Sequence, residues 1–252
     1  DQRPELDRWI LSELNSLITN VDEYYNDYEP TKAARLINTF VIDNLSNWYV
    51  RLSRRRFWKG DYEKDKISAF QTLFDVLINI AKVSAPISPF FMDRLFIDLT
   101  KNLNQRFSKS IHLEDFPVAD KSKIDLKLQE KVKYAQTISS LTLSLRAKEK
   151  IKVRQPLSKI LIPVDNARQK EIINSVSDEI KREVNVKKIE FLESESDLLV
   201  KSIKPNFKKL GPNYGRYMKE ITNLTNSLDN SSILGLEKTG KIDLLIDKKT
   251  IT

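Results

Sequence analysis

The chain has 252 residues, 40% of them hydrophobic and 31% charged, a composition typical of folded globular proteins. Its net charge of +8 and pI of about 9.4 suit a polyanionic partner without requiring one. Because it has no cysteine and a single histidine, His112, thiol catalysis, disulfides, thiolate zinc sites and multi-histidine metal sites are excluded.

No apolar run in the sequence approaches the ~20 residues that span a bilayer. The first residues, DQRPELDRW, lack the apolar centre of a signal peptide. We therefore expect a cytoplasmic protein without a membrane partner.

The first half of the chain shows apolar residues three and four positions apart, which predicts long amphipathic helices. The first follows residues 6–24, and a second carries an apolar stripe over 37–52 and ends at Gly60-Asp61. A third covers about 65–84, and Ser88-Pro89 opens a fourth that runs to about Leu103. Their short connections predict a helical bundle.

Beyond this bundle, residues 109–117 are expected to lie extended across it, and a further helix over about 125–148 connects to the second half. After Lys150 the pattern alternates, which predicts strands at 151–153 and 160–164, followed by a helix over 167–182.

The last part predicts strands at 184–191 and 198–203, a helix over 214–228, and a terminal hairpin between 234–236 and 242–246. The fold class is therefore mainly α, with a helical bundle over 1–117, a connecting helix over 118–150 and a smaller α+β C-terminal domain over 151–252. The closing residues DKKTIT form no clear terminal element, which leaves room for a longer parent.

The stretch from Asn47 to Trp58 combines four arginines with four aromatic residues. Arg51, Arg54 and Arg55 could bind phosphates, and Tyr49 or Trp58 could stack on bases. Arg56 falls close to the apolar stripe, so it must pair with a buried acid or the helix must end there. The alternative interpretation is a solvated helix face with ordinary ion pairs.

Two further basic runs are weaker signals. Arg154 lies in RAKEKIKVRQP, which equally fits a polar linker. Lys204, Lys208 and Lys209 lie in KPNFKKLGPNYGRYMKE, where a glycine-rich turn could direct backbone N–H groups at an anion. The alternative for this run is a structural turn with lysines in solvent.

His112 has Ser110 and Glu114 nearby, but nothing supplies an oxyanion hole or a nucleophile elbow. We expect a packed histidine. The carboxylates are scattered over helix surfaces, so no acid/base pair and no catalysis are predicted.

Four segments together resemble the anticodon-binding helical domain of class I aminoacyl-tRNA synthetases: DRWILSELNSLI, YEPTKAARLINTFVIDNLSNWYVRLSRRRFW, APISPFFMDRLF and SIHLEDFP. VRQPL and KPNFKKLGPNYG are similar to the isoleucyl-tRNA synthetase family in particular. The helical motifs alone also fit valyl- and leucyl-tRNA synthetases.

This resemblance implies a parent that activates isoleucine with ATP and Mg²⁺, loads it on tRNA and edits valine. The two nucleotide-site signatures of that catalytic core are absent from the sequence, as is an editing domain. We therefore expect a non-enzymatic C-terminal fragment without a cofactor of its own, with isoleucine tRNA and the parent's catalytic and editing domains as partners.

Our leading hypothesis is a tRNA-binding module that orients the anticodon stem. Neutralising ~4 phosphates predicts a log–log salt slope of roughly −3 to −4. The competing hypothesis is a structural module that packs on the catalytic core. The expected tRNA contacts are Arg51, Arg54, Arg55, Trp58, Lys59, Arg154, Lys204, Lys208 and Lys209.

Overall fold

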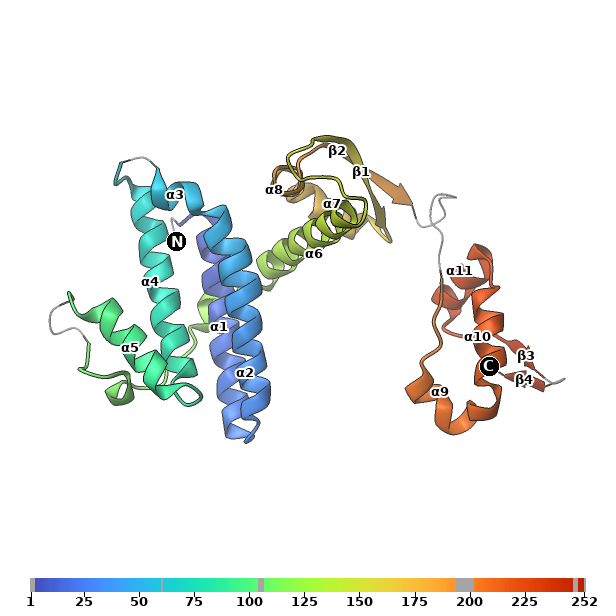
Figure 1. Ribbon diagram of the computed structural model, residues 1–252, viewed down its shortest axis with the longest axis horizontal. Helices are drawn as coiled ribbons and strands as arrows, with labels where there is room; N and C mark the ends of the chain where they lie inside the picture. Colours follow the sequence, from blue (N-terminus) through green and yellow to red (C-terminus); the bar gives the residue numbers. More distant parts are fainter. Residues whose placement is uncertain (1–2, 60, 104–106, 194–201, 247–248, 252) are drawn as a thin grey trace. The chain divides into compact units, whose positions relative to one another are not determined.

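The computed structural model describes residues 3–59, 61–103, 107–193, 202–246 and 249–251 (Figure 1). The chain forms two compact units, Asp1–Ser158 with Glu171–Lys188 (unit 1) and Lys159–Lys170 with Ile189–Thr252 (unit 2). The described part is mainly helical with two small sheets, which confirms the predicted fold class.

A helical bundle makes up most of unit 1, as predicted. Its long members are α1 (Glu5–Asn26), α2 (Pro30–Thr39), which continues as the π-helix η1 (Phe40–Val50), α4 (Lys64–Ser84) and α5 (Pro89–Thr100). Helix α1 packs against α2, η1 and α4, and α5 packs against α4 (Figure 1).

The core of the bundle follows from the apolar spacing of α1. The side chains of Ile10, Leu14, Leu17 and Val21 recur every three or four residues, and with that of Trp9 they are all buried. Alanines at 33, 69 and 81 are fully buried and let neighbouring helices approach closely. Pro30 and Pro89 occupy the first turns of their helices, where a missing N–H is tolerated.

The second helix ends after Leu52, the last residue of its apolar stripe, and so before the end predicted at Gly60-Asp61. The chain turns at the buried residue Ser53 and restarts as the short helix α3 (Arg54–Trp58), while Gly60 lies outside the described residues. Figure 1 shows α3 at the end of the bundle where α1 begins.

Residues 107–125 return across the bundle, with 3₁₀ turns η2 (Ile111–Leu113) and η3 (Lys121–Lys123). The carboxylate of Glu114 accepts from Lys82 Nζ at 2.8 Å, and the Asp93 carboxylate accepts from Ser110 Oγ at 2.7 Å. The segment predicted to lie across the bundle is thus held to α4 and α5 by its polar side chains.

The connecting helix is α6 (Leu126–Lys148), and the Asp125 side chain caps it by accepting from Leu128 N–H. Its start docks on α1, where Ser12 Oγ accepts from the Asp125 N–H and from Gln129 Nε2, both at 2.8 Å. Its later turns contact α8 (Ser177–Val184).

A βαβ arrangement follows α6. Strands β1 (Leu157–Val164) and β2 (Val186–Glu193) pair in a parallel two-stranded sheet, and α7 (Ala167–Ser175) and α8 lie between them in sequence. The helix predicted over 167–182 is broken at Val176. The strand predicted at 151–153 is wrong, because those residues form an irregular turn.

The rest of unit 2 contains α9 (Phe207–Tyr214), η4 (Gly215–Tyr217), α10 (Met218–Asn226) and α11 (Asn230–Thr239). Strand β3 (Leu244–Ile246) pairs antiparallel with β4 (Lys249–Ile251). The predicted hairpin is therefore wrong in its partner, since residues 234–236 are helical. Residues 198–201 of the strand predicted at 198–203 lie outside the described residues.

Helix α4 is the one helix among the described residues that is long and apolar enough to cross a membrane by length and composition alone. It lies between α1 and α5 in the bundle, with Val76, Ile80, Ala81 and Val83 buried. Its apolar character thus has an explanation in the core of unit 1.

Candidate nucleic-acid interface

The short helix α3 presents one face to solvent. None of its five residues is buried, and Arg54, Arg55 and Trp58 are exposed, with Trp58 at 80% of its full area. Lys59 follows the helix and is exposed as well. We call these four residues the α3 face.

Arg56 points in the opposite direction, into the bundle. Its two terminal nitrogens donate to the two oxygens of Asp7 at 2.6 and 2.8 Å, and its Nε donates to Asp65 at 3.0 Å. Of the two predicted alternatives, pairing with a buried acid is the one that the structure shows. The second helix has already ended at the turn at Ser53.

Asp7 is fully buried at the start of α1 and accepts four hydrogen bonds. Besides Arg56, the hydroxyls of Ser68 and Tyr49 donate to it at 2.7 and 3.0 Å. Burial pushes the pKa of the Asp7 carboxyl up, but the hydrogen bonds and the charge of Arg56 outweigh burial and hold that pKa below its ordinary value. The carboxylate therefore stays charged and ties α1 to η1, α3 and α4.

Three of the four aromatic residues in the stretch serve the core instead of the surface. Trp48 and Tyr49 are buried, and Phe57 packs edge-on between the rings of Tyr49 and Phe70 at centroid distances of 6.4 and 5.3 Å. Burial, followed by the charge of Asp7, raises the pKa of Tyr49. The suggestion that Tyr49 could stack on bases is wrong, which leaves Trp58.

Arg51 lies on the last turn before Ser53 and is already engaged. Its Nε donates to the Asn47 carbonyl at 2.8 Å, and its guanidinium forms an ion pair with Glu183 of α8 at 2.5 Å. The arginine side chain retains 40% of its exposure, while that of Glu183 retains 10%.

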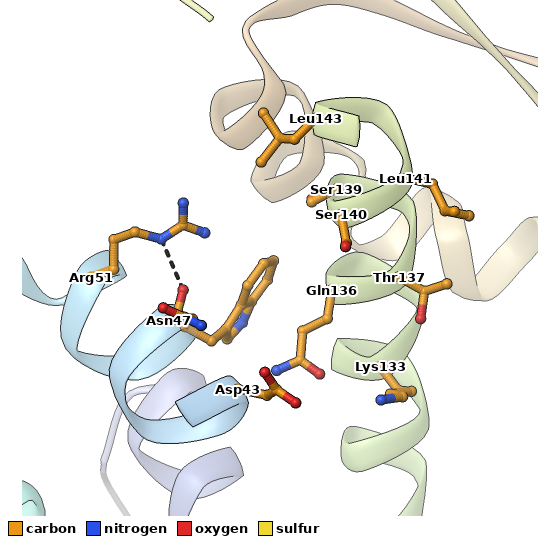
Figure 2. Close-up of a pocket in the computed structure, with 11 residues that line it drawn as sticks. Asp43, Asn47, Arg51, Lys133, Gln136, Thr137, Ser139, Ser140, Leu141 and Leu143 are labelled. Atoms are coloured by element: carbon orange, nitrogen blue, oxygen red, sulfur yellow. Dashed lines mark hydrogen bonds between the residues drawn. The ribbon is translucent and has the colours of Figure 1, made fainter. Parts of the chain in front are cut away.

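Arg51 also borders an open groove of about 530 Å³ between η1 and α6. Figure 2 shows Asp43, Asn47 and Arg51 on one side of this groove and Lys133, Gln136 and Thr137 on the other. Its lining is mixed: amides, hydroxyls and charges of both signs lie beside the apolar side chains of Trp48, Leu141 and Leu143.

Arg54, Arg55 and Lys59 differ from Arg51 and Arg56, since no carboxylate among the described residues pairs with them. Three cations beside an exposed indole form a compact positive surface. Such a surface can meet phosphate oxygens through its charges and a base or ribose through the ring.

The second basic run divides into a structural and an exposed arginine. Arg154 is exposed in the turn after α6. Arg146 is 2% exposed, and its guanidinium donates to the carbonyls of Lys152, Gln155 and Asn185 at 3.0–3.1 Å. Arg146 was not among the predicted site residues. It continues the buried stripe of α6, and an arginine within such a stripe is the signal of a structural role.

The third basic run lies in unit 2. Lys204, Lys208 and Lys209 are exposed, and the last two are on α9. The glycine-rich turn predicted here is wrong, because Gly211 and Pro212 lie inside that helix.

His112 is exposed, so the predicted packed histidine is wrong. The neighbouring Ser110 hydroxyl donates to Asp93, and Glu114 accepts from Lys82 and from the Ser108 N–H. Since both neighbours are engaged elsewhere, no nucleophile–base arrangement forms around His112. Within the described ranges, no three His, Asp or Glu side chains gather as a metal site would require.

Residues 7–161 match the family described as the anticodon-binding domain of tRNA ligase. The chain is 52% identical over 237 residues to an isoleucine–tRNA ligase of Cytophaga hutchinsonii, which covers 94% of this chain and 21% of that protein. The isoleucine–tRNA ligase of Bacteroides thetaiotaomicron is 51% identical over 246 residues, 98% of this chain and 21% of the relative.

A more distant isoleucine–tRNA ligase, from Thermus thermophilus, is 34% identical over 221 residues, 88% of this chain and 21% of the relative. The chain thus spans about a fifth of the length of the curated relatives that it matches. The α3 face and the buried ion pair behind it both lie within the stretch that matches the family. The chain belongs to the anticodon-binding domain family of tRNA ligases.

Proposed function

We propose that the chain is the part of an isoleucine–tRNA ligase that binds the anticodon stem of tRNA, and that the α3 face is its contact surface. The observation that carries this proposal is the pairing pattern of the arginines. Within a domain of the anticodon-binding family, Arg54 and Arg55 have no carboxylate partner among the described residues, and they flank an exposed Trp58.

The three cations of the α3 face would each approach a phosphate of the RNA backbone. Guanidinium groups suit this role because they donate two parallel hydrogen bonds to a phosphate. The Trp58 ring would pack on a ribose or an unstacked base, which gives affinity without strict sequence preference. Arg51 would contribute more weakly, since Glu183 already neutralises part of its charge.

Arg154 and the three lysines of unit 2 are proposed as additional contacts that extend along the RNA. Their exposure is compatible with this role. The division into a bundle over 1–117, a connecting helix over 118–150 and an α+β domain over 151–252 is likewise a proposal.

For the longer parent, we infer an ATP- and Mg²⁺-dependent ligase that esterifies tRNA with isoleucine in the cytoplasm, with catalytic and editing domains on the same polypeptide. The names of the relatives and the identity of 50% or more to two of them support isoleucine over valine or leucine. In this scheme the present chain orients the tRNA and takes no part in the chemistry.

The experiment is tRNA binding at fixed, low salt, with isoleucine and valine tRNAs as ligands. Arg54→Ala/Arg55→Ala should weaken binding about 5- to 30-fold, because each lost exposed ionic contact is worth about 0.5–1 kcal/mol. The control is Arg94→Ala/Arg182→Ala, which removes two exposed arginines of α5 and α8. Their side chains are 76% and 77% exposed, and they pair with Asp98 and Glu179.

The control variant has the same net charge as the test variant, so a purely non-specific attraction would weaken equally in both. Equal affinities of the two variants would contradict the assignment of the α3 face. Absence of any tRNA binding at low salt would contradict the function itself.

A second function, packing against other domains of the parent, has one observation in its favour. Phe90 and Phe91 at the start of α5 are 89% and 66% exposed, and Ile87 beside them is 44% exposed. Such neighbouring apolar side chains are unusual on a free surface and are typical of an interface. This role involves α5 and is compatible with RNA binding at α3.

A further inference from the structure

We infer that the buried ion pair between Asp7 and Arg56 positions α3 for RNA binding, so that Asp7 controls the affinity of a surface that it does not reach. This inference rests on the proposed function of the α3 face. It assigns a positioning role to two residues that point away from solvent.

Helix α3 cannot hold its own position. It has five residues, and isolated helices shorter than ~12 residues are unstable in water. None of its residues is buried, so it lacks the apolar stripe that fixes the longer helices of the bundle. Besides its junction with η1 at the buried Ser53, its orientation therefore depends on the contacts of its inward side chains, Arg56 and Phe57.

The helical angle links these inward contacts to the outward face. At 100° per residue, Arg56 and Phe57 are neighbours on one side, and residues 54, 55 and 58 fall within about 100° of one another on the other side. A rotation of α3 that frees Arg56 would consequently carry Arg54, Arg55 and Trp58 away from their common direction.

The Asp7–Arg56 contact is specific enough to set this rotation. Both terminal nitrogens of Arg56 donate to the two oxygens of Asp7, at 2.6 and 2.8 Å. Asp65, on the more exposed side, accepts from Nε at 3.0 Å and pairs with one terminal nitrogen at 2.9 Å. A planar fork on a planar carboxylate fixes direction as well as distance. Phe57 alone, between two rings, would tolerate sliding.

Asp7 is itself held in place from two other helices. The hydroxyl of Tyr49 from η1 and that of Ser68 from α4 donate to it at 3.0 and 2.7 Å. The orientation of α3 thus depends on contacts with α1, η1 and α4 of the bundle. Removing the charge of Asp7 would leave Asp65, whose side chain is 55% exposed, as the one carboxylate among the described residues that pairs with Arg56. The Ser53 hydroxyl and the Asp65 carbonyl would remain as neutral acceptors, so the guanidinium would be held less firmly and would move more easily toward solvent.

The test is a coupling experiment with Asp7→Asn, which keeps the size of the side chain. In the folded protein, we expect Asp7→Asn to weaken tRNA binding about as much as Arg54→Ala/Arg55→Ala does. The combined variant should bind no more weakly than either, because the outward arginines already fail to engage. A structural role alone would give additive losses, or none once the protein is folded.

The matched control is Glu114→Gln, which breaks the ion pair with Lys82 elsewhere in the same bundle, where the two side chains are 15% and 18% exposed. It should leave tRNA affinity unchanged in the folded protein. Should Asp7→Asn prevent folding, Arg56→Lys provides the test, since it keeps the charge and loses the fork. We expect it to give an intermediate loss of affinity.

A readout without RNA separates this inference from the proposed function. Amide hydrogen exchange of residues 53–59 should rise in Asp7→Asn and Arg56→Lys, but not in Glu114→Gln. Unchanged exchange there, or additive binding losses in the combined variant, would overturn the positioning role. If Arg54→Ala/Arg55→Ala leaves wild-type binding intact while exchange rises in Asp7→Asn, the proposed function fails and the positioning of α3 stands.

Discussion

Three consecutive arginines of α3 have different environments, although their side chains are identical. Arg56 meets a buried carboxylate, whereas Arg54 and Arg55 face solvent. The difference follows from their angles around a helix whose inward side is set by Phe57 and by the acids of α1 and α4. Position relative to the apolar stripe therefore separates a structural arginine from a candidate contact residue.

Arg146 is a second structural arginine and allows a prediction of stability. Replacing it by methionine should lower the free energy of unfolding by about 2 kcal/mol, since three partly buried hydrogen bonds from a charged donor to backbone carbonyls are lost. Urea denaturation of the variant checks this. Arg154→Met, at an exposed position of the same turn, should stay within about 0.5 kcal/mol of the wild type.

The kind of partner that Arg56 binds could be predicted from the sequence, whereas the partner of Arg51 could not. From the apolar stripe of one helix, Arg56 was predicted either to pair with a buried acid or to mark the end of the helix, and its partner is the buried Asp7. The partner of Arg51 is Glu183, more than a hundred residues later on α8. No local sequence pattern could predict that contact. The exposure of His112 was missed for a related reason, because a 3₁₀ turn replaces the extended backbone expected there.

At the scale of elements, the segment around Glu114 shows how polar contacts fix an irregular stretch. The Lys82 ammonium group, together with the Ser108 N–H, lowers the pKa of Glu114 to about 2 from its ordinary 4.5. A carboxyl whose pKa is lower in the folded than in the unfolded state stabilises the fold above the unfolded pKa, and this stabilisation is lost as pH falls through the folded pKa.

We therefore expect the stability difference between wild type and Glu114→Gln to be full at neutral pH and to shrink from about pH 4.5 to about pH 2. Thermal melts of the two proteins over this pH range measure it. A difference that is independent of pH would show that the ion pair with Lys82 is not its source.

Helices with long apolar stripes could be predicted from sequence. Short helices were harder to predict, because their apolar spacing competed with glycine and proline residues that favour turns. Residues 207–214 carry Phe207, Leu210 and Tyr214 at helical spacing, and the Asn206 side chain caps them, which outweighs Gly211 and Pro212. Thr239-Gly240 resembles a hairpin turn, but Gly240, at φ +72°, ends α11 instead.

The strand expected at 151–153 fails to form for a physical reason that only the tertiary structure reveals. The Arg146 side chain binds the carbonyls of Lys152 and Gln155, and the Asn185 side chain donates to that of Val153 at 2.8 Å. Those carbonyls are satisfied without a neighbouring strand. An alternating apolar pattern cannot predict that side chains distant in sequence will donate to these carbonyls.

At the scale of the whole molecule, the net charge of +8 attracts any polyanion, so affinity alone is weak evidence for a defined RNA surface. The number of ions released on binding is more informative, since it counts phosphates that are actually neutralised. Within the described stretch 47–59, Arg51 and Arg56 form ion pairs, which leaves Arg54, Arg55 and Lys59 as the basic side chains there without a carboxylate partner among the described residues.

The measurement that tests the central claim most directly is the salt dependence of isoleucine tRNA binding in wild type, Arg54→Ala/Arg55→Ala and the control Arg94→Ala/Arg182→Ala. If the α3 face neutralises phosphates, the log–log slope should become shallower by about 1.5 to 2 in the α3 variant and stay near the wild-type value in the control. Equal slopes in all three proteins would contradict the account.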